Sequence, residues 1–298
     1  MATQPIEELR LRRFGTPEDF YAEAERFLLE REAEHNLILG ICATLMGQPG
    51  HYEQEPYLAV VRGDVGVVAA AVMTPPHGIV LSLVSEPSAI PLISRDVHEL
   101  YPTLPGVLGP TRESICFAEA WQLVSGQEYR KLMAERIYRL EEVVPVEGVP
   151  GELRRAARAD RDLLVAWFQA FSDEAVGDTP VGWAERSVDR RLDSPISDIY
   201  VWYDGRPVSM AGYGGPTSNG IRVGPVYTPL EFRGRGYASA CVAALSQRLL
   251  DEGRRYCFLF TDLSNPTSNH IYQRIGYRPV CDVDQYQFLD TRGKDRGA

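Results

Sequence analysis

The sequence repeats itself at a fixed spacing, and this repeat restricts the possible folds more than any other feature. Three landmarks each recur 142 residues further along the chain: Leu11 and Leu153, Gly63 and Gly205, and Gly78 and Gly220. The first pair opens the tripeptide Leu-Arg-Arg, the second lies in turns between β-type segments, and the third begins a further β-type segment. Constant spacing of this kind predicts two similar domains built from one repeated unit.

Each copy of the repeat predicts a helix followed by three strands. The first helix has Thr16 as its N-cap and Pro17 at its first position, and the second helix follows Asp160. The apolar positions with helical spacing are Phe20, Ala24, Phe27 and Leu28 in the first copy and Leu163, Leu164, Trp167 and Phe171 in the second. Strands are expected at 56–61, 67–73 and from 78, and again at 197–203, 208–213 and from 220. The predicted fold class is α/β with mixed sheets, in two tandem copies.

A segment rich in Pro and Gly separates the two copies. Residues 143–151 read VVPVEGVPG and show no periodicity, so we expect a linker there. The predicted domains are therefore residues 1–146 and 147–298. The tail after Leu289 is polar and is expected to fray.

Composition excludes several classes of function. The 41 acidic residues outnumber the 31 basic ones, and the resulting charge of −10 repels nucleic acid. No apolar run approaches the roughly 18–20 residues that a membrane helix needs, and we expect no secretory signal at the start of the chain. The five cysteines are scattered without a CxxC pair and the histidines lack metal-ligand spacing, so we expect free thiols, a cytoplasmic protein and no metal. The oligomeric state is not determined.

The two copies differ in a loop that follows the third strand. In the second copy, Arg233-Gly234-Arg235-Gly236 connects a strand to an amphipathic helix that ends before Gly253. Glycines allow close approach of the backbone to a ligand, and a helix N-terminus carries partial positive charge, so this loop suits a pyrophosphate. The positions 142 residues earlier read Pro-Leu-Ile-Ser at 91–94, without glycine, and are expected to bind no phosphate.

Three motifs compete for this loop. A Rossmann fingerprint would lack its third glycine or alanine, and a P-loop would lack Gly-Lys-Ser/Thr. The signature Arg/Gln-x-x-Gly-x-Gly/Ala of the acetyl-coenzyme A loop matches every position from Arg233 to Ala238. A second motif, NPTSNHIYQRIGY at 265–277, follows in the expected order. From about Gly151 to Leu289 the chain resembles the GNAT (general N-acetyltransferase) superfamily, and the first half resembles a degenerate copy of the same fold.

The resemblance implies a site, residue by residue. In the family, backbone groups of the strand matching Val226, Tyr227 and Thr228 bind the pantetheine arm of acetyl-coenzyme A. The pyrophosphate is bound by amides of the loop that here consists of Arg233, Gly234, Arg235, Gly236, Tyr237 and Ala238. Asn265 matches a residue that commonly contacts the cofactor, although it equally suits an N-cap. Tyr272 matches the tyrosine that protonates the departing thiolate and is the predicted catalytic residue.

The general base is not evident from the sequence. Many family members carry a glutamate on the strand that here reads IRVGPVY at 221–227, and no carboxylate is present in it. The amine must lose a proton before it can attack, so a base or a water chain is required. The candidates are Asp173, Glu174, Asp262 and His270.

Three functions are compatible with these features. The first is transfer of an acetyl group from acetyl-coenzyme A to a small-molecule or peptide amine by direct attack in a ternary complex. The second is a non-catalytic coenzyme A-binding or sensor module, which the missing glutamate favours. The third is an enzyme specific for one acceptor, as in the tandem acetyltransferase mycothiol synthase, which the chain resembles in length. The loop at 173–183 is expected to border the acceptor, and its acidic residues would suit a cationic amine.

Overall fold

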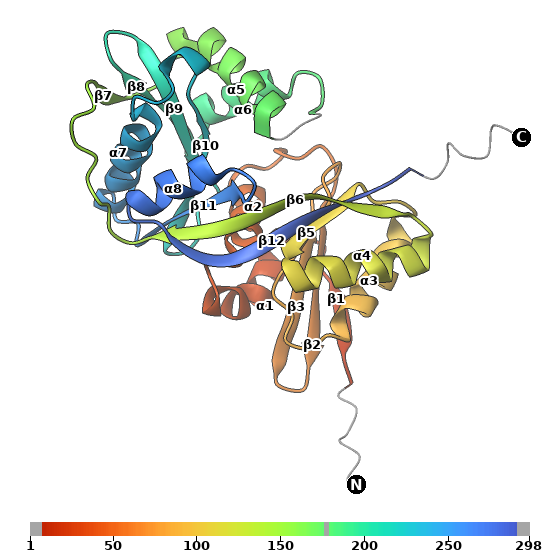
Figure 1. The fold of residues 1–298 in the computed structure, drawn as a ribbon. Helices are drawn as coiled ribbons and strands as arrows, with labels where there is room; N and C mark the ends of the chain where they lie inside the picture. The colour runs from red at the N-terminus through yellow and green to blue at the C-terminus, as the bar shows by residue number, and fades with distance from the viewer. Residues whose placement is uncertain (1–7, 176–178, 291–298) are drawn as a thin grey trace, which may run out of the picture. The chain divides into compact units, whose positions relative to one another are not determined.

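The computed structural model describes residues 8–175 and 179–290, and the chain forms two compact units (Figure 1). Unit 1 combines the N-terminal segment up to Arg136 with the segment from Cys281 onward, and unit 2 is Ile137–Val280. Part of the 173–183 loop and most of the tail expected to fray lie outside the described residues. Within the described ranges, no helix is long and apolar enough to cross a membrane.

Unit 1 contains most of the first copy of the repeat. Its elements are β1 (Arg10–Arg13), α1 (Pro17–Glu30), α2 (Asn36–Gly47), β2 (Tyr57–Gly63), β3 (Gly66–Met73), β4 (Ile79–Leu81), α3 (Ala89–Leu100), β5 (Gly106–Pro110) and α4 (Thr111–Ser125). The strand order is β1-β2-β3-β4-β5, and the next strand is the C-terminal β12 (Arg278–Phe288). β4 and β5 pair in parallel, whereas β1, β2, β3 and β4 form an antiparallel series.

Unit 2 contains the second copy. After β6 (Tyr129–Leu140), which begins in unit 1, its elements are β7 (Glu152–Arg155), η1 (Arg158–Asp160), α5 (Arg161–Ala175), α6 (Trp183–Asp193), β8 (Asp198–Tyr203), β9 (Pro207–Gly214), β10 (Gly220–Tyr227), η2 (Leu230–Phe232), α7 (Tyr237–Asp251), β11 (Tyr256–Asp262) and α8 (Pro266–Arg274). The strand order from the other edge is β7-β8-β9-β10-β11-β6. β10 and β11 pair in parallel, as β4 and β5 do in unit 1.

The repeat predicted from the sequence is confirmed, since both units show one order of elements: strand, two helices, three strands, helix, parallel strand, helix. The second helix of each copy, α2 and α6, had no sequence prediction. Thr16 is the N-cap of α1, and its side chain accepts a hydrogen bond from the amide of Asp19. The prediction for α5 was partly wrong, because Leu163 is 37% exposed and Phe168 is fully buried.

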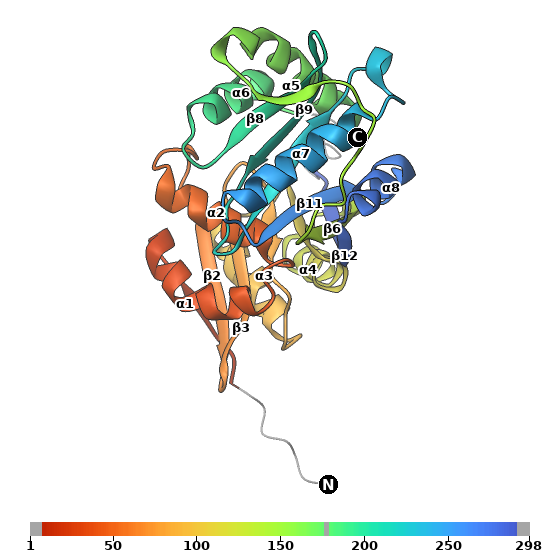
Figure 2. The same ribbon diagram turned by 90° about the vertical axis from the view of Figure 1, so that its left-hand side faces the viewer.

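Each sheet buries both faces under helices. In unit 2, α5 and α6 cover one face around Leu164, Phe168 and Val188, and α7 covers the other around Cys241 and Leu245 (Figure 2). Unit 1 has the same two layers, with α1 and α2 on one face and α3 and α4 on the other. The residues on both faces of the central strands are therefore apolar, as burial on both sides requires.

The compact units divide the chain differently from the predicted domains 1–146 and 147–298. The residues of β12 from Val283 to Gln287 pair antiparallel with β5, so the C-terminal strand completes the sheet of unit 1. Lys131 also forms an ion pair with Asp284 at 2.6 Å. β6 and β12 thus each contribute residues to both units. The Pro and Gly content of residues 143–151 indicates a linker but cannot reveal which strands pair.

Candidate functional site

β10 and β11 pair over three rungs and then separate. Gly220, Ile221 and Arg222 lie opposite Tyr256, Cys257 and Phe258, and Arg222 is the last residue of β10 in this register. On its other edge β10 stays paired with β9 as far as Tyr227, with a shift in register between Val223 and Val226. The second half of β10 therefore has a strand neighbour on one edge only. An unpaired edge of this kind can accept the amide groups of an extended ligand.

The turn that enters α7 is shaped for an anion. Gly234 and Gly236 have φ of 76° and 82°, in the left-handed region that favours glycine. Gly236 is the N-cap of α7, and no side chain caps this helix end. The first amides of α7 thus lack a capping side chain, and the helix dipole adds partial positive charge. Such a helix start can hold a phosphate group.

The structure turns the guanidinium of Arg233 back toward β10 and α5. Its Nε donates to the carbonyl of Thr228 at 2.8 Å, and its Nη2 donates to Glu174 Oε2 at 2.7 Å. The group also lies 5.6 Å from the centre of the Tyr227 ring. Arg233 therefore fixes the loop to its surroundings and has its charge neutralised locally. Of the two arginines predicted to add charge at the phosphate, the exposed Arg235 has no ion pair among the described residues.

Tyr237, the first residue of α7, anchors the helix start. Its hydroxyl donates to Asp204 Oδ2 at 2.7 Å, in the turn between β8 and β9. This hydrogen bond, together with burial, raises the pKa of Tyr237. The Tyr237 side chain thus has a structural role. What Tyr237 can contribute to anion binding is its backbone amide, together with the backbone amide of Ala238.

Tyr272 lies on α8 and packs against the apolar cluster under α7. Its ring is 6.0 Å from that of Tyr277, and burial raises the pKa of Tyr272 to about 12. Among the described residues no side chain or carbonyl accepts a hydrogen bond from its hydroxyl. A tyrosine in this state stays protonated at neutral pH and has its proton free to donate.

Asn265 caps α8, as one of its two predicted roles required. Its side-chain oxygen accepts from the amide of Ser268 at 3.1 Å. Sequence reasoning assigned no role to Asn269, which proves central: its Oδ1 accepts from Tyr138 at 3.0 Å and Thr261 at 2.6 Å. Its Nδ2 donates to the carbonyl of Asp262 at 2.9 Å. Asn269 therefore ties α8 to β6 and β11 and holds the helix that carries Tyr272.

The candidate bases are engaged elsewhere or exposed. Glu174 is paired with Arg233, and Asp173 accepts from Gln169 at 2.8 Å. Asp262 accepts from the amide of Ser264 at 2.7 Å and from its hydroxyl at 2.6 Å. His270 is exposed on α8. Of the four, Glu174 contacts the free half of β10, because the Tyr227 hydroxyl donates to its Oε1 at 3.5 Å. Asp262 is the last residue of β11, and no contact among the described residues brings Asp173 or His270 to the opening between β10 and β11.

In unit 1 the corresponding opening is filled by the protein itself. After β4, the amide of Leu83 donates to His35 Nε2 at 3.1 Å, and the amide of Val84 donates to Glu113 Oε1 at 3.4 Å. Both acceptors are buried side chains from α4 and the start of α2. The strand amides that an extended ligand would need are therefore already satisfied.

The expectation that residues 91–94 match the glycine loop is wrong, because they lie inside α3. α3 begins at Ala89 and α7 at Tyr237, a difference of 148 residues rather than 142. The connection from the third strand to the following helix is therefore six residues shorter in unit 1 than in unit 2. The true counterpart is 82–88, which contains neither glycine nor arginine. The prediction that this copy binds no phosphate therefore now depends on residues 82–88.

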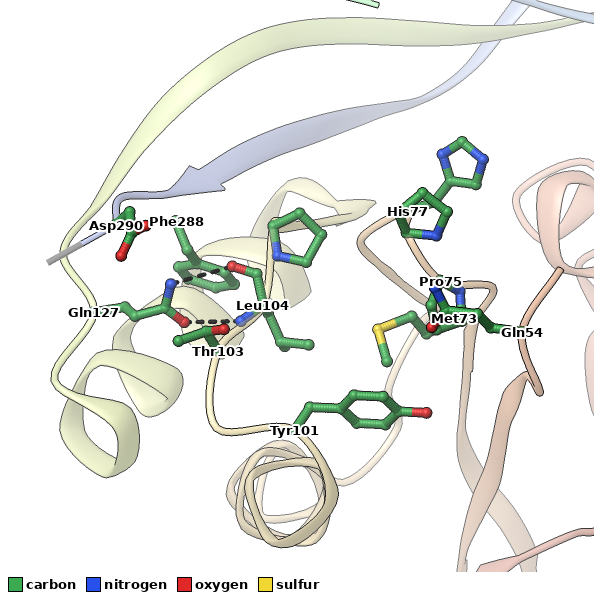
Figure 3. Close-up of a pocket in the computed structure, with 12 residues that line it drawn as sticks. Gln54, Met73, Pro75, His77, Tyr101, Thr103, Leu104, Gln127, Phe288 and Asp290 are labelled. Atoms are coloured by element: carbon green, nitrogen blue, oxygen red, sulfur yellow. Dashed lines mark hydrogen bonds between the residues drawn. The ribbon is translucent and has the colours of Figure 1, made fainter. Parts of the chain in front are cut away.

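Unit 1 also holds a cavity of about 450 Å³ away from this connection (Figure 3). It lies beside the loops at the starts of β4 and β5, with Met73, Leu104 and Phe288 among its lining residues. The side-chain amide of Gln127 holds the backbone of Leu104. Its Oε1 accepts from the Leu104 N–H at 2.8 Å, and its Nε2 donates to the Leu104 carbonyl at 3.2 Å. The cavity thus lacks a glycine turn or a helix start and does not resemble the opening in unit 2.

Comparison with known proteins decides the family of unit 2. Residues 162–277 match the acetyltransferase (GNAT) family. This segment is a GNAT acetyltransferase domain. Among curated proteins, none matches the chain in sequence.

Several solved structures share the fold over most of the chain. A GNAT-family acetyltransferase from Colwellia psychrerythraea aligns with a TM-score of 0.55 and 11% identity, covering 94% of this chain and 100% of that one. A GCN5-related N-acetyltransferase from Sphaerobacter thermophilus aligns with 0.58 and 18%, covering 94% and 95%. A tandem GNAT protein from the clavulanic acid biosynthesis pathway aligns with 0.53 and 12%, covering 95% and 98%. These likenesses show that the chain shares its fold with GNAT proteins, one of them a tandem GNAT protein, over most of its length.

Proposed function

We propose that unit 2 transfers an acetyl group from acetyl-coenzyme A to a small-molecule or peptide amine in a ternary complex. The observation that carries this proposal is the coincidence of three features in one unit: the opening between β10 and β11, the glycine turn at the start of α7, and Tyr272 with an unbonded hydroxyl. Unit 1 has the same order of elements, but among its described residues the corresponding opening is filled, and neither a glycine turn before α3 nor a tyrosine on α4 is present.

The residues present fit acetyl-coenzyme A, which would supply the acetyl group as a reactive thioester. The free edge of β10 at Val226, Tyr227 and Thr228 would pair with the pantetheine amides. The amides from Arg233 to Ala238 would hold the pyrophosphate. A Cβ at Gly236 would lie 2.9 Å from a methyl of Val149, so only glycine leaves the turn in this shape. The side-chain NH₂ of Asn265 is not used by its capping bond and can reach a ligand.

Tyr272 would act as the general acid. As the amine nitrogen bonds to the acetyl carbon and the carbon–sulfur bond breaks, the Tyr272 hydroxyl would donate its proton to the leaving thiolate. The protonated amide would then give up one proton to water, and the Tyr272 oxygen would recover one, so the protons balance. Burial in the same cluster raises the pKa of the Cys241 thiol to about 12. A sulfur held in such surroundings would be a stronger base than in water, which favours proton transfer from Tyr272.

The amine would lose its proton to water, because the strand at 221–227 carries no carboxylate. The same observation favours a second function, a module that binds coenzyme A and transfers nothing. The two functions differ in one measurable quantity, the release of free coenzyme A thiol in the presence of amines.

Titration calorimetry with acetyl-coenzyme A and a thiol-release assay test the proposal. In Tyr272→Phe we expect turnover to fall about 10²–10⁴-fold, the range for loss of a general acid, with the dissociation constant changed less than about twofold. Tyr256→Phe, in β11 of the same unit, is the matched control and should keep activity. If the wild-type protein does not bind acetyl-coenzyme A, both functions are refuted. If it binds acetyl-coenzyme A but releases no thiol with any amine tested, acetyl transfer is refuted and the binding module remains.

A further inference from the structure

The guanidinium of Arg233 lies among groups that together form a binding site for a cation. Its Nη2 donates to Glu174, at 2.9 Å from Oε1 and 2.7 Å from Oε2, and its Nε donates to the carbonyl of Thr228 at 2.8 Å. The centre of the Tyr227 ring is 5.6 Å from the guanidinium carbon, and the Trp167 ring lies 6.4 Å from that of Tyr227. A carboxylate, a carbonyl and an aromatic ring are groups that hold guanidinium and ammonium ions in proteins.

The ion pair that keeps Arg233 in this site is weak enough to be exchanged. The side chains of Arg233 and Glu174 are 41% and 45% exposed. Water screens both charges in an exposed pair of this kind, so the attraction between them is small. An anion that carries more charge than one carboxylate can therefore compete with Glu174 for the guanidinium.

Arg233 is placed where acetyl-coenzyme A would attract it away from Glu174. It directly precedes Gly234 in the turn that leads to α7, whose first amides have no capping side chain. A diphosphate at this helix start would lie beside Arg233 and carries more than one negative charge. The carbonyl of Thr228, which Arg233 now uses, is also one of the groups predicted to bind pantetheine. Both parts of the cofactor would therefore favour the departure of Arg233 from its present position.

The cation site lies on the face of the sheet that the acceptor would use. Tyr227 packs against the cluster under α5 and α6, whereas Tyr272 packs against the cluster under α7. The two clusters are on opposite faces of the sheet of unit 2. A sulfur that leaves toward Tyr272 takes the α7 side, so the amine approaches from the side of Tyr227 and Glu174.

We propose that Glu174 and the Tyr227 ring bind a positively charged group of the acceptor, and that Arg233 occupies this site until its guanidinium turns to the diphosphate of acetyl-coenzyme A. The acceptor is then an amine with a second positive charge, an ammonium or guanidinium group besides the nitrogen that is acetylated. The exchange and the acceptor class rest on the proposed function, whereas the cation site itself does not.

The cation site is tested first, without cofactor or turnover. Arg233→Ala empties the site, and the probe is ethylguanidinium, which equals the removed part of the side chain, followed by ligand-detected NMR. We expect saturable millimolar binding to Arg233→Ala, and binding at least about tenfold weaker when Glu174→Gln is added to this variant. Arg235→Ala is the matched control, because it removes an equal charge from the same loop while Arg233 still fills the site, and it should not bind the probe. Equal binding to all three proteins, or binding to none, would overturn the site.

The exchange is tested second, by calorimetry with acetyl-coenzyme A. In Glu174→Gln the guanidinium of Arg233 no longer has to leave a carboxylate, so we expect binding about two- to fivefold tighter than in Glu231→Gln. Glu231 is exposed and lies two residues before Arg233, so this control corrects for the loss of one negative charge near the phosphates. Equal affinity in the two variants would overturn the exchange. If the wild type binds no acetyl-coenzyme A, the proposed function is refuted and the ethylguanidinium result stands.

The acceptor class is tested third, by thiol release with paired amines. The pairs are 1,4-diaminobutane with n-butylamine and lysinamide with norleucinamide, and only the first member of each pair carries a second positive charge. We expect kcat/KM to favour the first member of at least one pair by about tenfold or more, which exceeds the roughly twofold statistical advantage of two amines. The preference should be lost in Glu174→Gln mainly through KM and kept in Glu231→Gln. Equal use of both members of each pair would overturn the inference.

Discussion

Replacement of Gly234 by alanine separates two reasons for a glycine in the turn before α7. At φ of 76° an alanine is strained by about 1–2 kcal/mol, partly offset because alanine restricts the unfolded chain by about 0.4–1 kcal/mol. The net loss of stability is therefore about 1 kcal/mol, which lowers the thermal midpoint by about 2–4 °C. A Cβ at this position meets no atom of the protein within 4 Å, so no clash adds to the loss.

If the pyrophosphate lies against this turn, the same methyl group displaces it. The loss of one or two hydrogen bonds to a charged group, each about 1.5–3 kcal/mol, weakens acetyl-coenzyme A binding by at least about tenfold. Gly126→Ala is the control, because Gly126 has φ of 75° in unit 1 and equally open surroundings. It should lose the same stability and bind normally. If Gly234→Ala loses stability and yet binds acetyl-coenzyme A as tightly as the wild type does, the hypothesis that this turn binds the pyrophosphate is refuted.

Two other outcomes follow from buried polar groups. His35→Ala removes the bonds of the ring to Leu28 at 2.9 Å and Leu83 at 3.1 Å, so denaturant unfolding should show a loss of about 2–4 kcal/mol. Calorimetry of His35→Ala should still find one acetyl-coenzyme A bound per chain, because residues 82–88 of unit 1 contain no glycine for a phosphate-binding turn. A second bound acetyl-coenzyme A would contradict this explanation. The raised pKa of Tyr272 contributes stability that is complete below pH 10 and is lost as pH rises toward about 12. Urea unfolding should therefore show the wild type losing stability relative to Tyr272→Phe only above about pH 10, and parallel curves would contradict it.

Predictions from the sequence were most successful where the signal is local. The N-cap at Thr16, the strands around the turns at Gly63 and Gly205, and the start of α7 depend on residues a few positions apart. Their conformations follow from capping, from β-propensity and from the left-handed turn that glycine permits. The motif at 265–277 likewise located α8, with Asn265 as its N-cap.

Side-chain direction was not predictable in the same way. The Arg-Gly-Arg-Gly loop suggested two cations at a phosphate, but Arg233 turns to Glu174, which lies 59 residues away in the sequence. The structural role of Asn269 depends on Tyr138, which is 131 residues away. No periodicity or spacing relates such partners, because folding brings them together through the sheet.

The sequence by itself determined that this protein is a tandem repeat of one α/β unit in which only the second copy has an arginine–glycine loop before its helix. Repetition and turn conformation depend on residues that are neighbours in the sequence. The tertiary structure decided the rest. It placed β12 beside β5 and filled the opening of unit 1 with His35 and Glu113. Each of these depends on pairing and burial between distant segments, whose free energy exists only once the sheets have formed.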